Sequence, residues 1–268
     1  YLEPAHIMLL VWGNDGGVGN GSSQTSFLLP FGDDGSGIVS LTAQGAGDTT
    51  PTFTRASTAY TRLSSGLFAS VATGQPRSYY AADGTYLGYL SEGARADVLG
   101  VTADIRRTMT DVGWVVGATM TVGAAVGVDG VADSGASLTG GAVTATNTIL
   151  FTTVLGSAER TFSAWIRRKT GTGTIEMTDN GGTNYTNITS TLTTTYKLFQ
   201  LTRTQANPIV GFRITTNTDA IEVDFNTIEA AAFANPTPIP VNVSKAADVL
   251  TYPSAGNAQQ TQSLYAEV

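Results

Sequence analysis

Four segments in the second half of the chain alternate between apolar and polar residues, within a threonine-rich run that spans residues 161–233. A period of two places successive side chains on opposite faces of a β-strand. One face of each segment would therefore be apolar and the other polar, as in a strand between a core and the surface. Thr and other β-branched residues suit such a half-buried surface. The segments are residues 162–166, 174–178, 210–214 and 221–225.

Turn-forming residues separate these segments. Gly, Asn, Asp and Pro are concentrated in residues 169–173, 179–182, 206–208 and 217–219. No apolar stripe of helical spacing is long enough to predict a helix. Short one-sided strands joined by turns predict an all-β fold, an antiparallel β-sandwich of the jelly-roll type. Further strands are predicted at residues 118–122, 135–138 and 148–154, which brings the total to roughly eight.

The composition divides the chain into four parts. Residues 1–50 are rich in Gly, Ser and Asp, and we interpret them as an irregular, loop-rich segment for anchoring and assembly. Residues 51–100 form a connecting segment, and residues 101–250 hold the jelly roll. Residues 251–268 are a polar linker followed by the first strand of a further domain, because a short unpaired strand is a poor end for a fold. We therefore expect a longer protein whose distal domain carries the receptor contact.

Composition and charge exclude several classes of function. The net charge of −7 argues against a nucleic-acid surface, which needs a basic patch. Cys is absent and His6 is the single histidine, so neither a Ser-His-Asp site nor a zinc site can form around the sandwich. The apolar residues 6–12 are too few to span a bilayer. We expect a protein that is not an enzyme, with no cofactor, no nucleic-acid partner and no membrane insertion.

Glu222 and Asp224 lie on the same face of one predicted strand. Paired carboxylates are compatible with glycoside hydrolysis, and hard oxygen ligands are compatible with calcium. An outward strand face is usually only polar, however, and nothing in the sequence forms a cleft there. We therefore expect both side chains to face solvent, and calcium binding and hydrolysis are the alternatives.

Trp165 falls on the polar face of its predicted strand, so we expect it to be exposed in an isolated subunit. Together with Tyr185 and Arg213 it is a candidate contact for a glycan or for a neighbouring subunit. Trp stacks on sugar rings and is favoured at interfaces. We favour the subunit contact. Trp114 and Tyr196 are assigned to the core.

Arg55, Arg77, Glu92 and Arg95 are four of the few charges in an aromatic segment that is otherwise low in charge. Charges of opposite sign in such a setting favour buried or bidentate pairing. We interpret them as a structural ion-pair set that fixes loop geometry. A site for an anion or a sugar acid is the alternative.

Three motifs in residues 52–59, 75–77 and 88–95 resemble a module of tailed-bacteriophage virion proteins. They read TFTRASTA, QPR and GYLSEGAR. The resemblance continues through Trp114, the turn at residues 127–130 and the segment TFSAW. It covers about residues 51–252, and the order and spacing of the motifs carry it.

The resemblance implies a jelly roll similar to carbohydrate-binding modules, in an external fibre or spike on the head or tail of a phage particle. It implies a location on the virion exterior, with other virion proteins bound through residues 1–50 and a host-surface glycan as a further partner. We expect a homotrimer, because one self-associating chain usually closes cyclically. The main hypothesis is a non-enzymatic structural component of the particle that aids host attachment. The alternatives are a glycan-binding receptor-recognition module and a polysaccharide depolymerase.

Overall fold

A computed structural model of the chain describes residues 52–99, 103–110, 113–143, 146–240 and 244–251. The expected anchoring segment and the expected linker with its further strand lie outside these residues. The chain forms two compact units. The sandwich unit is Arg95–Lys245, and the smaller unit contains residues 52–94 together with residues 246–251.

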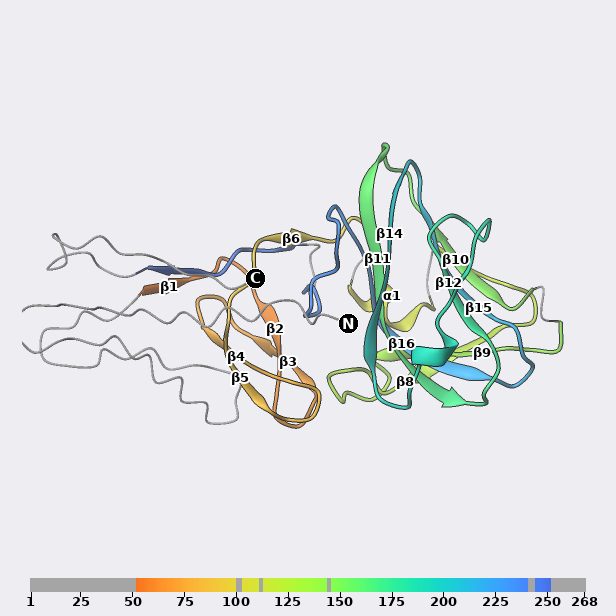
Figure 1. Ribbon diagram of the computed structural model, residues 1–268, viewed down its shortest axis with the longest axis horizontal. Coiled ribbons are helices and arrows are strands. Elements are labelled where there is room, and N and C mark those ends of the chain that lie inside the picture. Colours follow the sequence, from red (N-terminus) through yellow and green to blue (C-terminus); the bar gives the residue numbers. More distant parts are fainter. Residues whose placement is uncertain (1–51, 100–102, 111–112, 144–145, 241–243, 252–268) are drawn as a thin grey trace, which may run out of the picture. The chain divides into compact units, whose positions relative to one another are not determined.

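The sandwich unit consists of two five-stranded antiparallel sheets (Figure 1). We call them the β15 sheet and the β11 sheet. The order in the β15 sheet is β13 (Thr186–Asn187), β12 (Ile175–Thr178), β15 (Ile209–Ile214), β10 (Thr148–Thr152) and β7 (Trp114–Val116). The order in the β11 sheet is β14 (Lys197–Gln205), β11 (Ala158–Thr170), β16 (Ala220–Glu229), β9 (Gly135–Thr139) and β8 (Thr121–Ala125). This architecture confirms the predicted all-β jelly-roll sandwich.

Three short elements complete this unit. Strand β6 (Arg95–Ala96) pairs with β17 (Ser244–Lys245), and α1 (Ala103–Thr108) packs against β16. A 3-10 turn, η2 (Thr189–Thr191), follows β13. In the part of the chain that the structure describes, every helix is too short or too polar to cross a membrane.

The four alternating segments lie in β11, β12, β15 and β16, except that β12 begins one residue after the predicted start at Thr174, and the predicted turns separate them. Asn207 and Thr218 take positive φ angles of 47° and 65° in two of these turns, a conformation that Asn tolerates better than most residues. The strand expected at residues 118–122 begins three residues later, as β8. The reason is a tight turn in which the N–H of Met120 donates to the carbonyl oxygen of Gly117 over 3.0 Å.

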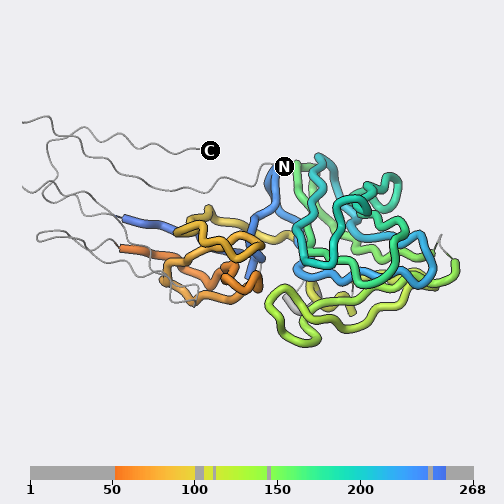
Figure 2. Tube along the Cα trace, turned by 60° about the horizontal axis from the view of Figure 1, so that its bottom comes forward, coloured from red at the N-terminus to blue at the C-terminus, as the bar shows by residue number. Residues whose placement is uncertain are grey.

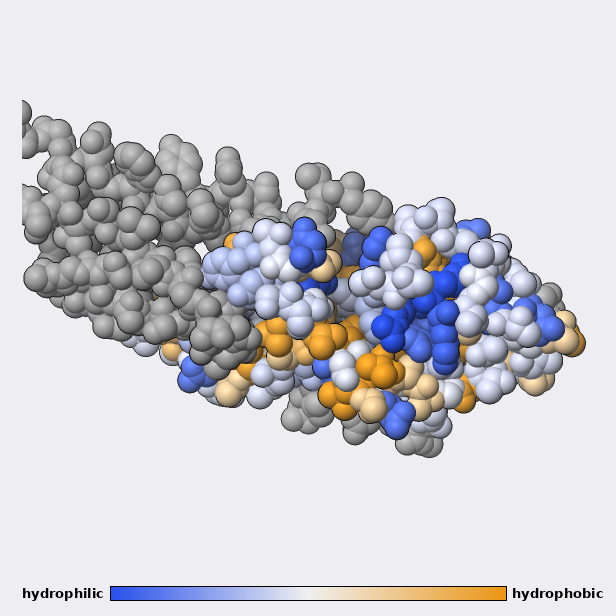
Figure 3. Space-filling view, turned by 90° about the horizontal axis from the view of Figure 1, so that it is seen from below, coloured by the Kyte–Doolittle hydropathy of each residue, from blue (hydrophilic) through white to orange (hydrophobic). Residues whose placement is uncertain are grey.

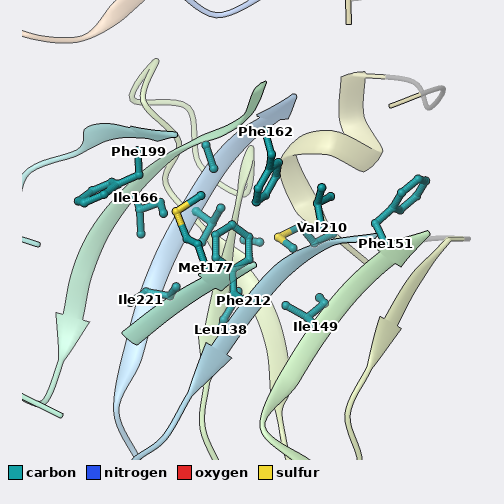
Figure 4. Packing of buried hydrophobic residues seen from close by; sticks show 14 of the residues in the cluster. Leu138, Ile149, Phe151, Phe162, Ile166, Met177, Phe199, Val210, Phe212 and Ile221 are labelled. Carbon is teal, nitrogen blue, oxygen red and sulfur yellow. The ribbon is translucent and has the colours of Figure 1, made fainter. Parts of the chain in front are cut away.

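The core lies between the two sheets, where the apolar faces of their strands meet (Figure 4). The rings of Phe162 from β11 and Phe212 from β15 lie 5.7 Å apart across this interface. Trp114 packs against Phe151 at 5.2 Å, in the core as predicted. Complete burial of a side chain such as Phe162 stabilises the fold by about 2–3 kcal/mol.

The smaller unit is built from strand pairs. Strands β2 (Ala59–Arg62) and β3 (Phe68–Val71) form one hairpin, and β4 (Arg77–Tyr80) and β5 (Tyr86–Leu90) form another. Strand β1 (Thr52–Thr54) pairs with β18 (Val249–Thr251), and Figure 2 shows the two side by side at opposite ends of the colour scale. The chain thus returns to this unit after the sandwich, so the sandwich runs from residue 95 to residue 245 instead of 101 to 250.

Candidate functional site

A single row of side chains crosses the outer face of the β11 sheet, which points away from the core. Gly123 of β8 lies opposite Ser137 of β9, which in turn lies opposite Glu222 of β16. Glu222 pairs with Arg167 of β11. Tyr196, the residue before β14, ends the row, with the Arg167 guanidinium carbon 4.4 Å from the centre of its ring. The row points outward because the residues on either side of it along the strands point into the core.

Two cations share one carboxylate in this row. Arg167 Nε lies 2.5 Å from Glu222 Oε2, and Lys169 Nζ lies 3.7 Å from Glu222 Oε1. Lys169 Nζ also donates a hydrogen bond to Ser137 Oγ over 2.9 Å. The side chains of Arg167 and Lys169 are 30% and 43% exposed, whereas that of Glu222 is 12% exposed. The row therefore offers mainly N–H donors to solvent, held by a carboxylate that is itself mostly covered.

Tyr196 supplies an aromatic ring at one end of the row. Its hydroxyl donates to the carbonyl oxygen of Val126 over 2.8 Å, which anchors the ring to the loop after β8. Burial raises the pKa of the Tyr196 hydroxyl well above its usual value, so it stays a donor. At the other end, a side chain on Gly123 would meet open space. The row thus begins at the fixed ring of Tyr196 and ends at Gly123, where the surface of the sheet is uncovered.

Beside the row, the Asp224 carboxylate anchors the same loop. Asp224 is fully buried and accepts hydrogen bonds from Arg107 Nε over 2.8 Å and from the N–H of Val128 over 2.9 Å. Arg107 also pairs with Asp129, with 2.7 Å between Nη2 and Oδ2. Gly127 lets the loop approach this carboxylate closely, because a Cβ atom at this position would lie 2.4 Å from Asp224 Oδ2. This network fixes the loop against the sheet.

The electrostatics of the network follow from burial and hydrogen bonding. Burial raises the pKa of Asp224, against the hydrogen bonds from Arg107. Burial also disfavours the Arg107 guanidinium, but its hydrogen bonds to Asp224 and Asp129 raise its pKa overall. A raised pKa favours the neutral form of Asp224 but the charged form of Arg107, so the two shifts disagree about whether the pair is ionised. Geometry decides between them, because the Asp224 carboxylate accepts hydrogen bonds from both Arg107 and the backbone and so stays ionised at neutral pH.

Trp165 is not exposed, and the expectation from strand alternation is wrong. Its side chain lies on the outer face, where the register places it between Leu198 and Asp224, but it is only 4% exposed. The expectation assumed an open outer face. Instead, α1 packs against β16, and Arg107 reaches over Phe225 and Asp224 on this side of the sheet. Trp165 is therefore a packing residue, with too little exposed surface to contact a sugar or another subunit.

The expectation that Glu222 and Asp224 face solvent is also wrong. They share a face of β16, but both are buried, since Arg107 binds Asp224 while Arg167 and Lys169 bind Glu222. Among the residues that the structure describes, no three His, Asp or Glu side chains come together in a way that could hold a metal ion. The carboxylate oxygens proposed for calcium are already bound by cations of the protein.

Tyr185 and Arg213 come together on the outer face of the other sheet, the β15 sheet. The guanidinium carbon of Arg213 lies 3.7 Å from the centre of the Tyr185 ring, and Arg213 Nε lies 2.6 Å from Glu176 Oε2. Both Tyr185 and Arg213 are partly exposed. Trp165 belongs to the β11 sheet, so the three candidate contact residues do not form one site.

In the smaller unit, Arg55, Arg77 and Glu92 converge on Asp248. Arg55 Nη1 lies 3.0 Å from Asp248 Oδ1, and Arg77 Nη2 lies 2.9 Å from Glu92 Oε2 and also contacts Asp248. The side chains of Arg55, Arg77 and Asp248 are 0% exposed, so they have no open surface for an anion. Arg95 does not join them, because it lies in the sandwich unit.

Sequence reasoning missed Arg167, Lys169, Tyr196 and Glu176 as site residues, and Asp248 as the partner of the arginines. Alternation along β11 places Arg167 and Lys169 on its polar face, and two cations on one polar strand face were an available signal. Asp248 had no local signal, because it lies far along the chain from the arginines that it binds.

The surface of the sandwich unit combines polar and apolar areas. In the space-filling view from below, strongly hydrophilic side chains gather near the centre of this unit, with apolar side chains along one border (Figure 3). Val126 and Val131, in the loop after β8, are 43% and 56% exposed.

No protein-family model and no curated protein matches the chain significantly. Among solved structures, it is similar to the CBM22-1 xylan-binding domain of Paenibacillus barcinonensis Xyn10C. This match has a TM-score of 0.35 and 15% identity, over 54% of this chain and 100% of that chain. The tandem CBM22-1–CBM22-2 domain of the same protein matches with a TM-score of 0.34 and 17% identity, over 55% and 50% of the two chains.

A third similar structure contains the CBM22-1 and GH10 modules of the Clostridium thermocellum endo-1,4-β-D-xylanase 10B, in complex with xylohexaose. It matches with a TM-score of 0.33 and 13% identity, over 52% of this chain and 28% of that chain. Similarity at these TM-scores carries no argument about the ligand. The jelly-roll sandwich is established by its own sheets, and its function has to be argued from its own residues.

Proposed function

We propose that the chain is a non-catalytic glycan-binding module, and that the glycan binds along the row on the outer face of the β11 sheet. The observation that carries the proposal is the Arg167 guanidinium, which stacks on the Tyr196 ring and pairs with Glu222. This arrangement fixes a planar donor over an aromatic ring on a rigid sheet.

A sugar ring has two kinds of surface, and the row matches both. Its C–H faces pack against aromatic rings such as Tyr196. Its hydroxyl groups accept hydrogen bonds from Arg167 and Lys169, which the mostly covered carboxylate of Glu222 holds in place. Because Arg167 is already held in place, binding a sugar costs little additional side-chain entropy.

Glycan hydrolysis is not part of the proposal. Glycosidases generally need two carboxyl groups that flank the scissile bond. Glu222 is held by Arg167 and Lys169, and Asp224 is fully buried against Arg107, which leaves it without access to a substrate. A reducing-sugar release assay on any polysaccharide that binds should therefore stay at background, and release of sugar would contradict this part.

A glycan microarray tests the proposal. We expect the full chain to bind a subset of the oligosaccharides and Arg167→Gln to lose about tenfold in affinity, which corresponds to about 1.4 kcal/mol. Arg203→Gln is the matched control, because Arg203 is 42% exposed and paired with Asp179 but lies off the row. Failure of the wild-type chain to bind any glycan, or an equal loss in Arg203→Gln, would refute the proposal.

We also propose that this module belongs to an external fibre or spike of a bacteriophage particle, where glycan binding would serve attachment to the host. The support is the order and spacing of the motifs in residues 52–59, 75–77 and 88–95. Antibody labelling of intact particles is the test. Labelling of the particle exterior is expected, and particles without the chain would refute this placement.

A further inference from the structure

We infer that the outer face of the β15 sheet is a second sugar-binding surface, built on Tyr185, Arg213 and Glu176. The inference rests on the proposed function, because it gives the same class of ligand, an oligosaccharide, to the opposite face of the sandwich. It would make a single chain bivalent.

The second surface repeats the chemistry of the row on the β11 sheet. The guanidinium-to-ring distance is 3.7 Å for Arg213 and Tyr185, against 4.4 Å in the row. The distance from Arg213 Nε to Glu176 Oε2 is 2.6 Å, against 2.5 Å for the ion pair in the row. Exposure agrees as well, since the arginines are 32% and 30% exposed and the glutamates 13% and 12%. Different strands thus build the same Tyr, Arg and Glu arrangement on both faces.

The loop that carries Tyr185 is held in place by its own hydrogen bonds. Thr178 Oγ1 donates to the carbonyl oxygen of Asn184 over 2.8 Å and accepts from the N–H of Gly182 over 3.0 Å. Asn180 Oδ1 accepts from the N–H of Asn184 over 2.9 Å. Gly182 has a φ of +82°, and a Cβ atom there would lie 2.5 Å from the Tyr185 hydroxyl oxygen. Only glycine therefore allows the ring to lie where it does.

Polar groups continue across this sheet on either side of the ion pair. Asn187 of β13 lies opposite Glu176, and Thr148 of β10 lies opposite Arg213. Asn187 is exposed and Thr148 partly exposed. Within the described residues, the Tyr185 hydroxyl donates to no protein acceptor, so it can donate to a ligand. Ring, hydroxyl, guanidinium and amide together offer the contacts that a pyranose needs.

The two surfaces lie on opposite sides of the sandwich and cannot serve one short oligosaccharide. Two packed sheets are about 10 Å apart, and their outer faces point in opposite directions. Each surface would therefore hold a separate glycan chain. Two linked sites raise the avidity for a dense glycan layer without any new contact.

The experiment compares four full-length proteins on one glycan microarray of neutral and acidic oligosaccharides. They are the wild type, Arg167→Gln for the row, the pair Tyr185→Ala and Arg213→Gln for the second surface, and all three changes combined. We expect each single-face variant to keep part of the array signal and the combined variant to lose all of it. Native mass spectrometry with the oligosaccharide of strongest array signal should show two bound copies on the wild type and one on each single-face variant.

The outcomes separate this inference from the proposed function. If Arg167→Gln alone abolishes the array signal and the wild type takes up one oligosaccharide, the second surface is refuted and the row stands. If only the Tyr185 and Arg213 variant loses binding, the second surface stands and the row is refuted. A wild type that binds nothing overturns both. Tyr185→Phe, which keeps the ring, should retain most of the second-surface binding, and its loss there would contradict the stacking argument.

Discussion

Replacement of Asp224 by Asn should destabilise the sandwich strongly, whereas replacement of Glu222 by Gln should not. Both changes remove one negative charge from the same face of β16 and preserve the size of the side chain. They differ in burial, because the side chain of Asp224 is 0% exposed and that of Glu222 is 12% exposed. Their partners differ as well, with Arg107 11% exposed and Arg167 30% exposed.

The expected magnitudes follow from these contacts. The Asp224 carboxylate accepts hydrogen bonds of 2.8 Å from Arg107 and from the N–H of Phe225, and one of 2.9 Å from the N–H of Val128. An Asn amide has only one oxygen, so its NH2 group must face a donor. Loss of one partner of a fully buried pair costs about 3–5 kcal/mol, whereas a pair whose arginine keeps about a third of its surface in solvent lies near the surface value of about 0–1 kcal/mol. Since Arg107 keeps Asp129, we expect about 3 kcal/mol for Asp224→Asn and at most about 1 kcal/mol for Glu222→Gln.

Urea unfolding at pH 7, followed by tryptophan fluorescence, measures both values. With Trp12 replaced by Phe in every protein compared, the signal comes from Trp114 and Trp165. Both lie in the sandwich unit, so the signal reports its transition even if the smaller unit unfolds separately. A free energy of unfolding for Asp224→Asn within about 1 kcal/mol of the wild type would refute the reasoning. So would equal costs for the two variants, because burial would then not be the deciding factor.

Further predictions concern the buried ion pairs around Asp248, stability at acid pH, the loop that carries Tyr185, and the oligomeric state. Asp248→Asn should open the smaller unit to limited proteolysis, because it removes the carboxylate shared by two buried guanidinium groups; an unchanged digestion pattern would contradict this. Against burial, the hydrogen bond from the N–H of Val131 and the ion pair with Arg107 lower the pKa of Asp129. Its stabilisation is thus present above about pH 4 and lost as the pH falls through the lowered value, so the gap in free energy of unfolding between Asp129→Asn and the wild type should shrink on acidification. Gly182→Ala should lower the melting temperature through a strain of about 1–3 kcal/mol, while Gly123→Ala, with open space around it, should leave it near that of the wild type. Light scattering on the full chain should give the mass of a trimer, and a monomer mass would refute that expectation. Trp165 no longer supports it, because this residue is buried and cannot be the expected subunit contact.

Alternation was enough to predict the sandwich, because each core strand needs one apolar face wherever it lies in the sheet. Phe162 and Phe212 were assigned to the inward face from their own neighbours in sequence, and they meet in the core. Trp165 shows where this reasoning ends. Alternation assigns its face correctly, but whether that face is covered depends on Arg107 and α1, which lie far away in sequence. Tyr196, assigned to the core, lies instead at the edge of the outer face, where its hydroxyl reaches Val126.

The exposure of each arginine separates the charges that hold the fold from those that can meet a ligand. Most of the 14 Lys and Arg residues form ion pairs with a carboxylate. The sequence alone does not distinguish the buried pairs from the exposed ones. Arg77 has no exposed surface, and any contact with a ligand would require the unit to open. Arg167 and Arg213 keep about a third of their surface in solvent, while their glutamates are mostly covered and hold them from one side. A guanidinium that is oriented by the protein and still open to solvent can bind a hydroxyl group without first breaking its ion pair. The two Tyr–Arg–Glu sets fulfil this condition and the Asp248 set does not, so the search for a glycan should begin on the two outer faces of the sandwich.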